Sequence, residues 1–178
     1  MSLDGDLKAR LQRTLRDVTD FPKPGIVFKD ITPVLADAVL FAETMTAMAA
    51  PARNLGVTHV AGIESRGFIL AAPIALELGA GFIPIRKPGK LPWRSIGKDY
   101  ALEYGSDRLE MHADAVPSGA RVLLVDDVLA TGGTAAAAAA LIEEGGGYVV
   151  GCSFLLAIAA LHGAERLRGR PLQVLLGV

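Results

Sequence analysis

The chain has 178 residues, of which 51% are hydrophobic and 21% charged, and this suits one folded domain with a sizeable core. A formal net charge of −1 gives no general reason to expect nucleic acid as a partner, and a single cysteine excludes an internal disulfide bond. The longest nearly apolar stretch, residues 148–161, is shorter than the roughly 20 residues that span a bilayer. The N-terminus also lacks the apolar core of a signal peptide, so we expect a cytoplasmic protein with no membrane partner.

The first elements in chain order are a helix and a proline-rich loop. Apolar residues recur at helical spacing over residues 6–16, which predicts an amphipathic helix. The next segment, DFPKPGIVFKDITP, contains three prolines and a glycine and is therefore predicted to lack regular structure. Thr32 and Pro33 have the pattern of a helix N-terminus, and from there a helix is predicted to continue to about Leu55.

Apolar strands and helices alternate over the rest of the chain. Strands are predicted at residues 57–63, 81–85, 121–125, 149–156 and 172–176. A hairpin that turns at Gly105–Ser106 is predicted between the second and third of them. The alternation predicts an α/β fold in which helices flank a central, mostly parallel five-stranded sheet. Ligands of such sheets bind at the carboxyl ends of the strands, which directs attention to the loops at residues 64–68, 86–99 and 126–134.

The stretch VLLVDDVLATGGT places two adjacent aspartates and a turn of small residues directly after an apolar strand. Asp126 and Asp127 can accept hydrogen bonds from two neighbouring hydroxyls, as a ribose offers. The loop at residues 130–134 opens a helix, where small residues let backbone N–H groups approach an anion. Each half alone is also compatible with a metal site, a plain strand end or an ordinary turn. Together the halves are typical of a site for ribose 5-phosphate, and the Gly-Lys-Ser/Thr ending of a P-loop is absent.

Five motifs resemble, in order and in spacing, those of the type I phosphoribosyltransferases, and within that family those of the members that use adenine. The motifs are DFPKPGIVFKDITP, GIESRGF, IRKPGKLP, YALEYG and VDDVLATGGT, and the similarity extends over about residues 20–167. The resemblance implies the type I phosphoribosyltransferase fold in a single domain of residues 1–178. It also implies a small N-terminal hood at residues 1–35 that binds the base, and a flexible lid hairpin at residues 86–105.

The implied reaction transfers the 5-phosphoribosyl group from phosphoribosyl diphosphate to N9 of adenine, giving AMP and diphosphate in purine salvage. By resemblance, phosphoribosyl diphosphate is expected to bind to Ser65, Arg66, Arg86, Lys87, Lys90, Asp126, Asp127, Ala130, Thr131, Gly132, Gly133 and Thr134. Adenine is expected to bind to Val27, Phe28, Lys29 and Val128. The expected catalytic residues are Glu103, Tyr104 and Arg66. The family also has a cis peptide bond, which falls here between Glu64 and Ser65.

The residue types suit these roles. Arginine grips phosphate with a fork of donors and lysine acts as a point charge. The ring of Phe28 can stack on a purine, and backbone groups of Val27 and Lys29 would read the amino edge of adenine, rejecting the carbonyl of hypoxanthine or guanine. Glu103 would serve as general acid/base on a lid that excludes water, with Tyr104 positioning it. The alternatives are core packing for Phe28, an ordinary hairpin position for Glu103 and a solvated basic loop for residues 86–90.

Mg²⁺ is the expected cofactor, because diphosphate chelates it. In the family the metal is held mainly by substrate and water, so no protein ligand is predicted. A homodimer is implied by resemblance as well. Two departures from the family pattern are Lys29, where many relatives have arginine, and Ala157, where a glutamate is common.

Two other functions stay open at this point. One is a phosphoribosyltransferase for hypoxanthine, guanine or xanthine, against which Phe28 and the segment at residues 100–105 favour adenine. The other is a non-catalytic regulator that senses phosphoribosyl diphosphate. Such regulators usually carry a DNA-binding domain, for which this chain has neither spare length nor a basic recognition helix.

Overall fold

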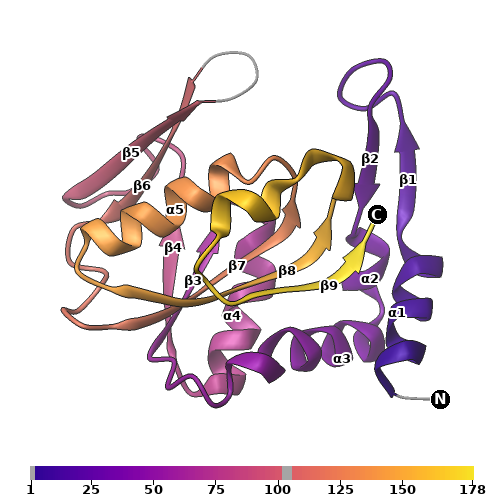
Figure 1. The fold of residues 1–178 in the computed structure, drawn as a ribbon, viewed down its shortest axis with the longest axis horizontal. Helices are drawn as coiled ribbons and strands as arrows, with labels where there is room; N and C mark the ends of the chain where they lie inside the picture. Colours follow the sequence, from indigo (N-terminus) through magenta and orange to yellow (C-terminus); the bar gives the residue numbers. More distant parts are fainter. Residues whose placement is uncertain (1–2, 102–105) are drawn as a thin grey trace. The chain divides into compact units, whose positions relative to one another are not determined.

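The computed structural model describes residues 3–101 and 106–178 (Figure 1). The chain divides into two compact units, Met1–Ala47 and Met48–Val178. Among the described residues, no helix has the length and apolar character needed to cross a membrane.

The first unit contains helix α1 (Leu3–Thr14), an antiparallel pair formed by β1 (Arg16–Thr19) and β2 (Val27–Asp30), helix α2 (Thr32–Ala36) and most of α3 (Ala38–Ala49). The helix predicted at residues 6–16 is confirmed as α1. Strand β2 corrects the prediction that the proline-rich segment lacks regular structure. The reason is that Pro22, Pro24 and Gly25 lie in the turn before β2, closed by a 2.7 Å bond from the Gly25 N–H to Asp20.

The single helix predicted from Thr32 to about Leu55 is wrong, because Asp37 divides it. The carboxylate of Asp37 accepts the backbone N–H groups of Val39 and Leu40 at 3.0 and 2.9 Å, so it caps the start of α3. Helix α3 ends at Ala49 and is followed by the short 3₁₀-helix η1 (Ala50–Ala52), which contains Pro51.

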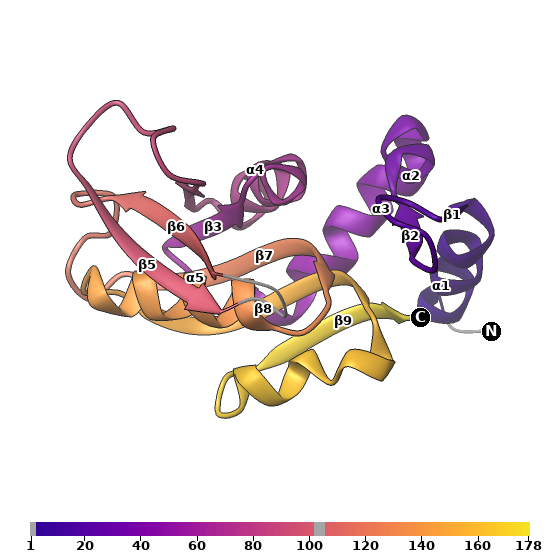
Figure 2. The same cartoon turned by 90° about the horizontal axis from the view of Figure 1, so that it is seen from above.

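The second unit is built on a five-stranded sheet in the order β4-β3-β7-β8-β9. Its strands are β3 (His59–Ile63), β4 (Gly81–Ile85), β7 (Arg121–Leu129), β8 (Tyr148–Ala157) and β9 (Leu172–Gly177). All neighbouring pairs are parallel, which confirms the predicted five-stranded sheet. Helices α4 (Arg66–Leu78) and α5 (Gly133–Glu144) lie on opposite faces of this sheet (Figure 2). The apolar strands are therefore covered on both sides, which explains their continuous hydrophobic runs.

The alanine run of α5 allows it to pack closely against both the sheet and a hairpin. The hairpin consists of β5 (Ser95–Ala101) and β6 (Ser106–His112), and Leu109 and Met111 of β6 share one buried cluster with the helix alanines. Ala101 is paired with Ser106, so the predicted turn at Gly105–Ser106 is wrong, since Ser106 already belongs to β6. The residues that connect the two strands are outside the described part of the chain.

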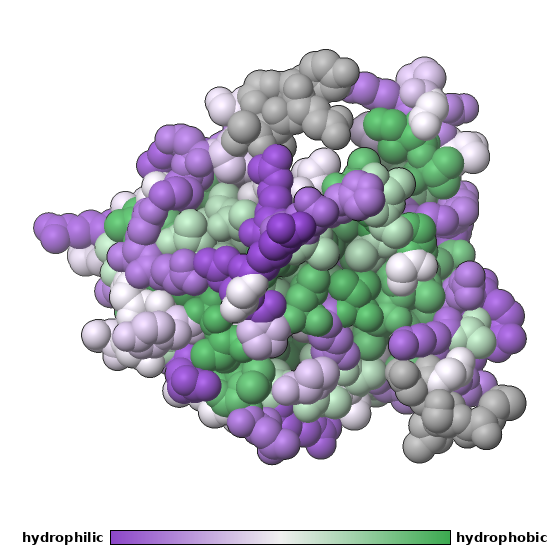
Figure 3. Space-filling view, in the orientation of Figure 1, coloured by the Kyte–Doolittle hydropathy of each residue, from purple (hydrophilic) through white to green (hydrophobic). Residues whose placement is uncertain are grey.

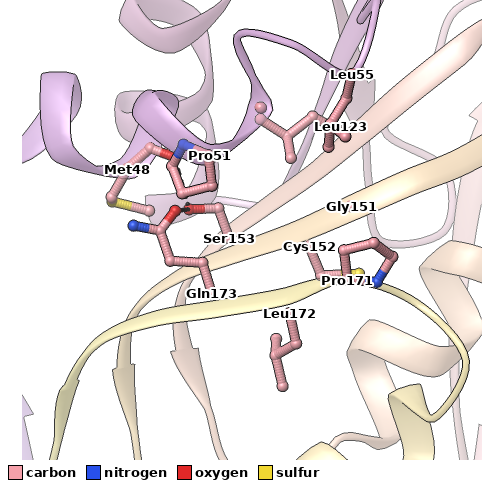
Figure 4. A pocket seen from close by; sticks show the side chains of 11 residues that line it. Met48, Pro51, Leu55, Leu123, Gly151, Cys152, Ser153, Pro171, Leu172 and Gln173 are labelled. Atoms are coloured by element: carbon pink, nitrogen blue, oxygen red, sulfur yellow. Dashed lines mark hydrogen bonds between the residues drawn. The ribbon is translucent and has the colours of Figure 1, made fainter.

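A cavity of about 130 Å³ lies against β7, β8 and β9, next to η1 (Figure 4). Its wall is mainly apolar and includes Met48, Leu123 and Cys152. Ser153 at this wall donates a 3.0 Å hydrogen bond to the carbonyl of Met48. No predicted site residue lines the cavity.

Candidate active site

Three loops follow the carboxyl ends of parallel strands and therefore meet at one edge of the sheet. They are the β3–α4 loop at Glu64–Ser65, the segment that follows β4 from Arg86, and the β7–α5 loop at residues 130–132. Strand β7 continues to Leu129, because Asp126 pairs with Phe154 of β8 and Leu129 with Ala157. The interpretation that Asp126 and Asp127 follow the strand is thus corrected: both lie inside β7, at its sixth and seventh residues.

Asp127 and Arg66 link the end of β7 to the start of α4. The Asp127 side chain is 5% exposed and accepts a hydrogen bond from Nε of Arg66, the first residue of α4. Arg66 itself is 43% exposed, so its guanidinium reaches from a buried carboxylate to the surface of the edge. A buried carboxylate needs such a charged partner, and the pair fixes where the arginine points.

Asp126 is in a different electrostatic state. Burial raises the pKa of its carboxyl well above the usual value, and the neighbouring Asp127 charge raises the pKa further. The hydrogen bond from the Asp127 N–H and the charge of Arg66 lower the pKa, but by less. Gly67 makes the close approach of α4 possible, because a Cβ there would lie 2.8 Å from Oδ1 of Asp126. The two adjacent carboxylates thus have unlike surroundings, and Asp126 holds a proton to higher pH than an ordinary aspartate.

The β7–α5 loop has the conformation of an anion cradle at a helix N-terminus. Gly132, with φ +78°, is the N-cap of α5, and no side chain caps this helix. Gly132 and Gly133 are buried while Thr131 and Thr134 are half-buried. The uncapped N–H groups and the helix dipole favour an anion here.

Gly163 packs against this loop and was not predicted. It opens the 3₁₀-helix η3 (Gly163–Leu167), which follows η2 (Ala159–Leu161) after β8. A Cβ on Gly163 would lie 2.1 Å from the carbonyl oxygen of Ala130. The only signal in the sequence is a glycine after a histidine, which gives no hint of such a contact.

Glu64 organises the basic segment after β4 and was also missed as a site residue. The predicted cis peptide bond between Glu64 and Ser65 is confirmed. Oε2 of Glu64 accepts Nε of Arg86 at 3.0 Å and the backbone N–H of Lys87 at 3.1 Å. Arg86 in turn donates to the carbonyl of Lys90 at 3.0 Å, while Ser65 and Lys90 are exposed. The position of Glu64, between a buried strand and Ser65–Arg66, is a signal from which its role could have been found.

Lys87 lies in a network with the β5–β6 hairpin. Its Nζ donates to the hydroxyl of Tyr100 at 3.1 Å and to Oδ2 of Asp107. Burial works against the charge of Lys87, but these bonds and charges outweigh it and raise its pKa. The bond from Lys87 likewise lowers the pKa of Asp107, against the effect of burial. Tyr100 and Asp107 were not predicted as site residues, because the hairpin turn was placed at the wrong position.

The predicted adenine-binding residues fall in both units. In the first unit, Val27 is exposed, and the Phe28 ring makes an edge contact with Phe21 at 5.2 Å between centroids. Nζ of Lys29 pairs with Asp17 at 2.7 Å. In the second unit, Val128 is half-buried on β7. The two lid residues expected to act in catalysis, Glu103 and Tyr104, lie outside the described residues.

Comparison with known proteins identifies the family. The model of the family described as "Phosphoribosyl transferase domain" matches residues 39–174. Adenine phosphoribosyltransferase of Myxococcus xanthus is 60% identical over 164 residues, covering 92% of this chain and 89% of that protein. The crystal structure of adenine phosphoribosyltransferase from Rhodothermus marinus matches with a TM-score of 0.94 at 48% identity, covering 98% of this chain and 99% of that one.

A third match is a structure of a complex. It is the Saccharomyces cerevisiae adenine phosphoribosyltransferase complexed with an imino-altritol bisphosphate and adenine, with a TM-score of 0.91 and 35% identity over 97% of this chain and 99% of that one. The chain therefore belongs to the phosphoribosyltransferase family, and within that family to the adenine phosphoribosyltransferases.

Proposed function

We propose that this chain transfers the 5-phosphoribosyl group from phosphoribosyl diphosphate to N9 of adenine, giving AMP and diphosphate in purine salvage. The observation that carries the proposal is the meeting, at one sheet edge, of an uncapped helix N-terminus, a carboxylate pair and basic side chains. The adenine phosphoribosyltransferases to which the chain is similar support adenine as the base.

The phosphoribose binds to β7 and the loop that follows it. The 5-phosphate accepts hydrogen bonds from backbone N–H groups of Ala130, Gly132, Gly133 and Thr134 and from the hydroxyl of Thr131, with help from the α5 dipole. The carboxylates of Asp126 and Asp127 accept the ribose hydroxyls. Because these donors and acceptors belong to a strand and a helix start, they are in place before the substrate arrives.

The diphosphate binds to the two basic segments. Arg66 and Ser65 bind the diphosphate at the start of α4. Arg86, Lys87 and Lys90 bind it from the segment after β4. Their charges stabilise the negative charge that develops on the leaving group as the C1–O bond breaks.

Mg²⁺ accompanies the diphosphate. Among residues 3–101 and 106–178, no group of three or more His, Cys, Asp or Glu side chains could hold a metal ion. A cation held by substrate oxygens and water would neutralise the diphosphate when bound.

The base and the chemistry are assigned to the hood at residues 1–35 and the lid at residues 86–105 of one phosphoribosyltransferase domain. Phe28 stacks its ring on the purine, and Val128 contacts the purine from β7. Val27 and Lys29 are two residues apart on β2, so their backbone polar groups point to the same side of that strand, as reading one edge of adenine requires. Glu103 handles the proton of the purine ring, with Tyr104 positioning it.

We also propose a cytoplasmic homodimer. Hydrophobic as well as hydrophilic side chains reach the surface in Figure 3. Within the second unit, large apolar side chains are exposed on α4 and on the edge strand β4, namely Ile69, Leu76 and Phe82. A second copy covering them would remove this area from water. Light scattering on the purified chain tests the proposal, and a monomer at micromolar concentration contradicts it.

The proposed activity is tested by incubating the chain with phosphoribosyl diphosphate, Mg²⁺ and, in separate reactions, adenine, hypoxanthine, guanine and xanthine. AMP formed from adenine, with little or no nucleotide from the others, is the expected result. Nucleotide formed mainly from another base assigns the chain a different substrate. Binding of phosphoribosyl diphosphate without consumption of any base shows a sensor.

A further inference from the structure

A network of side chains on the β5–β6 hairpin joins two of the phosphate-binding segments. Tyr100 and Asp107 are directly opposite each other in the hairpin, and the Tyr100 hydroxyl donates to Oδ2 of Asp107 at 3.1 Å. Lys87 donates to both of them. The hydroxyl of Thr134, in the first turn of α5, donates to the Tyr100 hydroxyl at 3.4 Å. A single phenol oxygen therefore links the lysine after β4 to the start of α5.

The hydrogen-bonding capacity of the Tyr100 hydroxyl is used completely. A phenol has one donor and two acceptor sites, and Tyr100 gives its donor to Asp107 and accepts from Lys87 and Thr134. Asp107 accepts the backbone N–H of Arg108 at 2.8 Å with its other oxygen. An ammonium has three donors, of which the hairpin takes two from Lys87. The Lys87 side chain is 37% exposed, so its third donor has room to meet a substrate oxygen.

We propose that Tyr100 and Asp107 are positioning residues for phosphoribosyl diphosphate, which hold the Lys87 ammonium at a fixed place relative to the phosphate cradle at Thr134. This rests on the proposed function, which assigns the diphosphate to Lys87 and the 5-phosphate to the cradle. A free lysine side chain has four rotatable bonds, and the substrate would have to immobilise them. Two hydrogen bonds to the hairpin fix the Lys87 ammonium before the substrate binds, so binding does not have to immobilise it.

The neighbouring pair of the same hairpin provides a matched control. Asp99 and Arg108 are the next opposite pair, and Nη1 of Arg108 lies 3.0 Å from Oδ2 of Asp99. Because successive side chains of a strand point to opposite faces, this ion pair lies on the other face of the hairpin from Tyr100 and Asp107. Asp99→Asn therefore removes a carboxylate from the same hairpin without touching the Lys87 network.

The test compares Asp107→Asn, Tyr100→Phe, Lys87→Ala and Asp99→Asn by steady-state kinetics. We expect Asp107→Asn and Tyr100→Phe each to raise the KM for phosphoribosyl diphosphate about five- to tenfold, with kcat and the adenine KM within about twofold of wild type. Asp99→Asn is expected to leave all three constants within about twofold. If Asp107→Asn does not fold, as judged by circular dichroism, Tyr100→Phe carries the same expectation with the loss of one oxygen atom.

A double variant separates positioning through Lys87 from a general effect on the hairpin. In the Lys87→Ala background, Asp107→Asn is expected to add less than about a twofold change in KM. An effect of Asp107→Asn that equals that of Asp99→Asn, that persists in full without Lys87, or that falls on kcat alone overturns the inference. Wild-type turnover in the same assay tests the proposed function separately. If wild type has none, calorimetric binding of phosphoribosyl diphosphate to the same variants replaces KM as the readout.

Discussion

Gly132 and Gly163 face each other so closely that neither position has room for a Cβ. A Cβ on Gly132 would lie 2.3 Å from the carbonyl oxygen of Gly163, and one on Gly163 would lie 2.9 Å from the backbone nitrogen of Gly132. Real Cβ atoms do not approach backbone this closely, so the phosphate cradle and the start of η3 fit together only as two glycines. The shape of the cradle therefore depends on a residue about 30 positions further along the chain.

Gly163→Ala is predicted to displace the cradle. The added methyl group forces the backbone of Ala130 or Gly132 to move, and we expect the KM for phosphoribosyl diphosphate to rise at least about tenfold and the protein to lose about 1–3 kcal/mol of stability. The KM for adenine should change little. Gly177→Ala is the matched control, because nothing lies within 4 Å of a Cβ at that position. Equal effects of the two substitutions on the KM would contradict this interpretation of Gly163.

Asp126→Asn is predicted to stabilise the substrate-free protein at neutral pH. The pKa of Asp126 in the folded state lies well above its usual 3.8 because of burial and of the Asp127 charge. The folded state therefore binds the proton more tightly than the unfolded state, and stability falls as pH rises from about 4 through the raised pKa. Above that window the full cost of the buried charge is present, and the amide removes it.

Urea unfolding of wild type and Asp126→Asn at pH 7.5 and at pH 4 checks this expectation. The variant should be more stable at pH 7.5, and the difference should shrink at pH 4, where the aspartate of wild type is protonated. Asp114→Asn, at an exposed position, is the control. A variant that is less stable than wild type at pH 7.5 would show that the carboxylate of Asp126 is favourably placed in the folded protein.

Glu64→Gln is predicted to loosen the basic segment after β4. In wild type, Oε2 of Glu64 accepts hydrogen bonds from both Arg86 and the Lys87 N–H. The glutamine keeps one acceptor oxygen but loses the charge that holds Arg86. We expect kcat/KM for phosphoribosyl diphosphate to fall roughly tenfold, since bonds to charged groups contribute about 1.5–3 kcal/mol. Glu77→Gln alters a comparable Glu–Arg pair, with Arg53, at a distance from the predicted site residues. It should leave kcat/KM unchanged, and a similar loss in both variants would refute a specific role for Glu64.

Cys152 is predicted to be unreactive while the chain is folded. Burial raises the pKa of its thiol to about 12, with a smaller rise from the Glu143 charge and an opposing effect of Arg170. Because only the thiolate reacts, labelling by iodoacetamide at pH 8 should be more than about a hundredfold slower in the native protein than in urea. Mass spectrometry over time measures both rates. Fast labelling of native protein would mean that the β8 region opens readily.

Much of the fold followed from the sequence because apolar runs and glycines mark parallel strands and helix ends. Strand β2 was missed because prolines next to it suggested a loop throughout, although they occupy only the turn. The end of β7 was placed too early because aspartates are unusual inside strands. The division of α2 from α3 depends on Asp37 acting as a cap. The sequence pattern does not predict this role, because an aspartate can also occur within a helix.

The site was predictable where it is local and unpredictable where it depends on packing. The cradle at residues 130–134 is one continuous segment, so its pattern is visible in the sequence. Glu64, Asp107 and Gly163 act on Arg86, Lys87 and Ala130, which are 22, 20 and 33 positions away. Such contacts depend on the parallel sheet and on the register of the β5–β6 hairpin, and an error of a few residues in that register assigns the wrong partners.

We propose that phosphoribosyl transfer to adenine takes place at the carboxyl edge of β7. The most direct test is the rate of AMP formation by the double variant Asp126→Asn, Asp127→Asn, with wild type in parallel. Two charge-assisted bonds to the ribose hydroxyls contribute about 3 kcal/mol or more together, so kcat/KM for phosphoribosyl diphosphate should fall at least about a hundredfold in the folded variant. A folded double variant that keeps more than about half of the wild-type kcat/KM would contradict the claim.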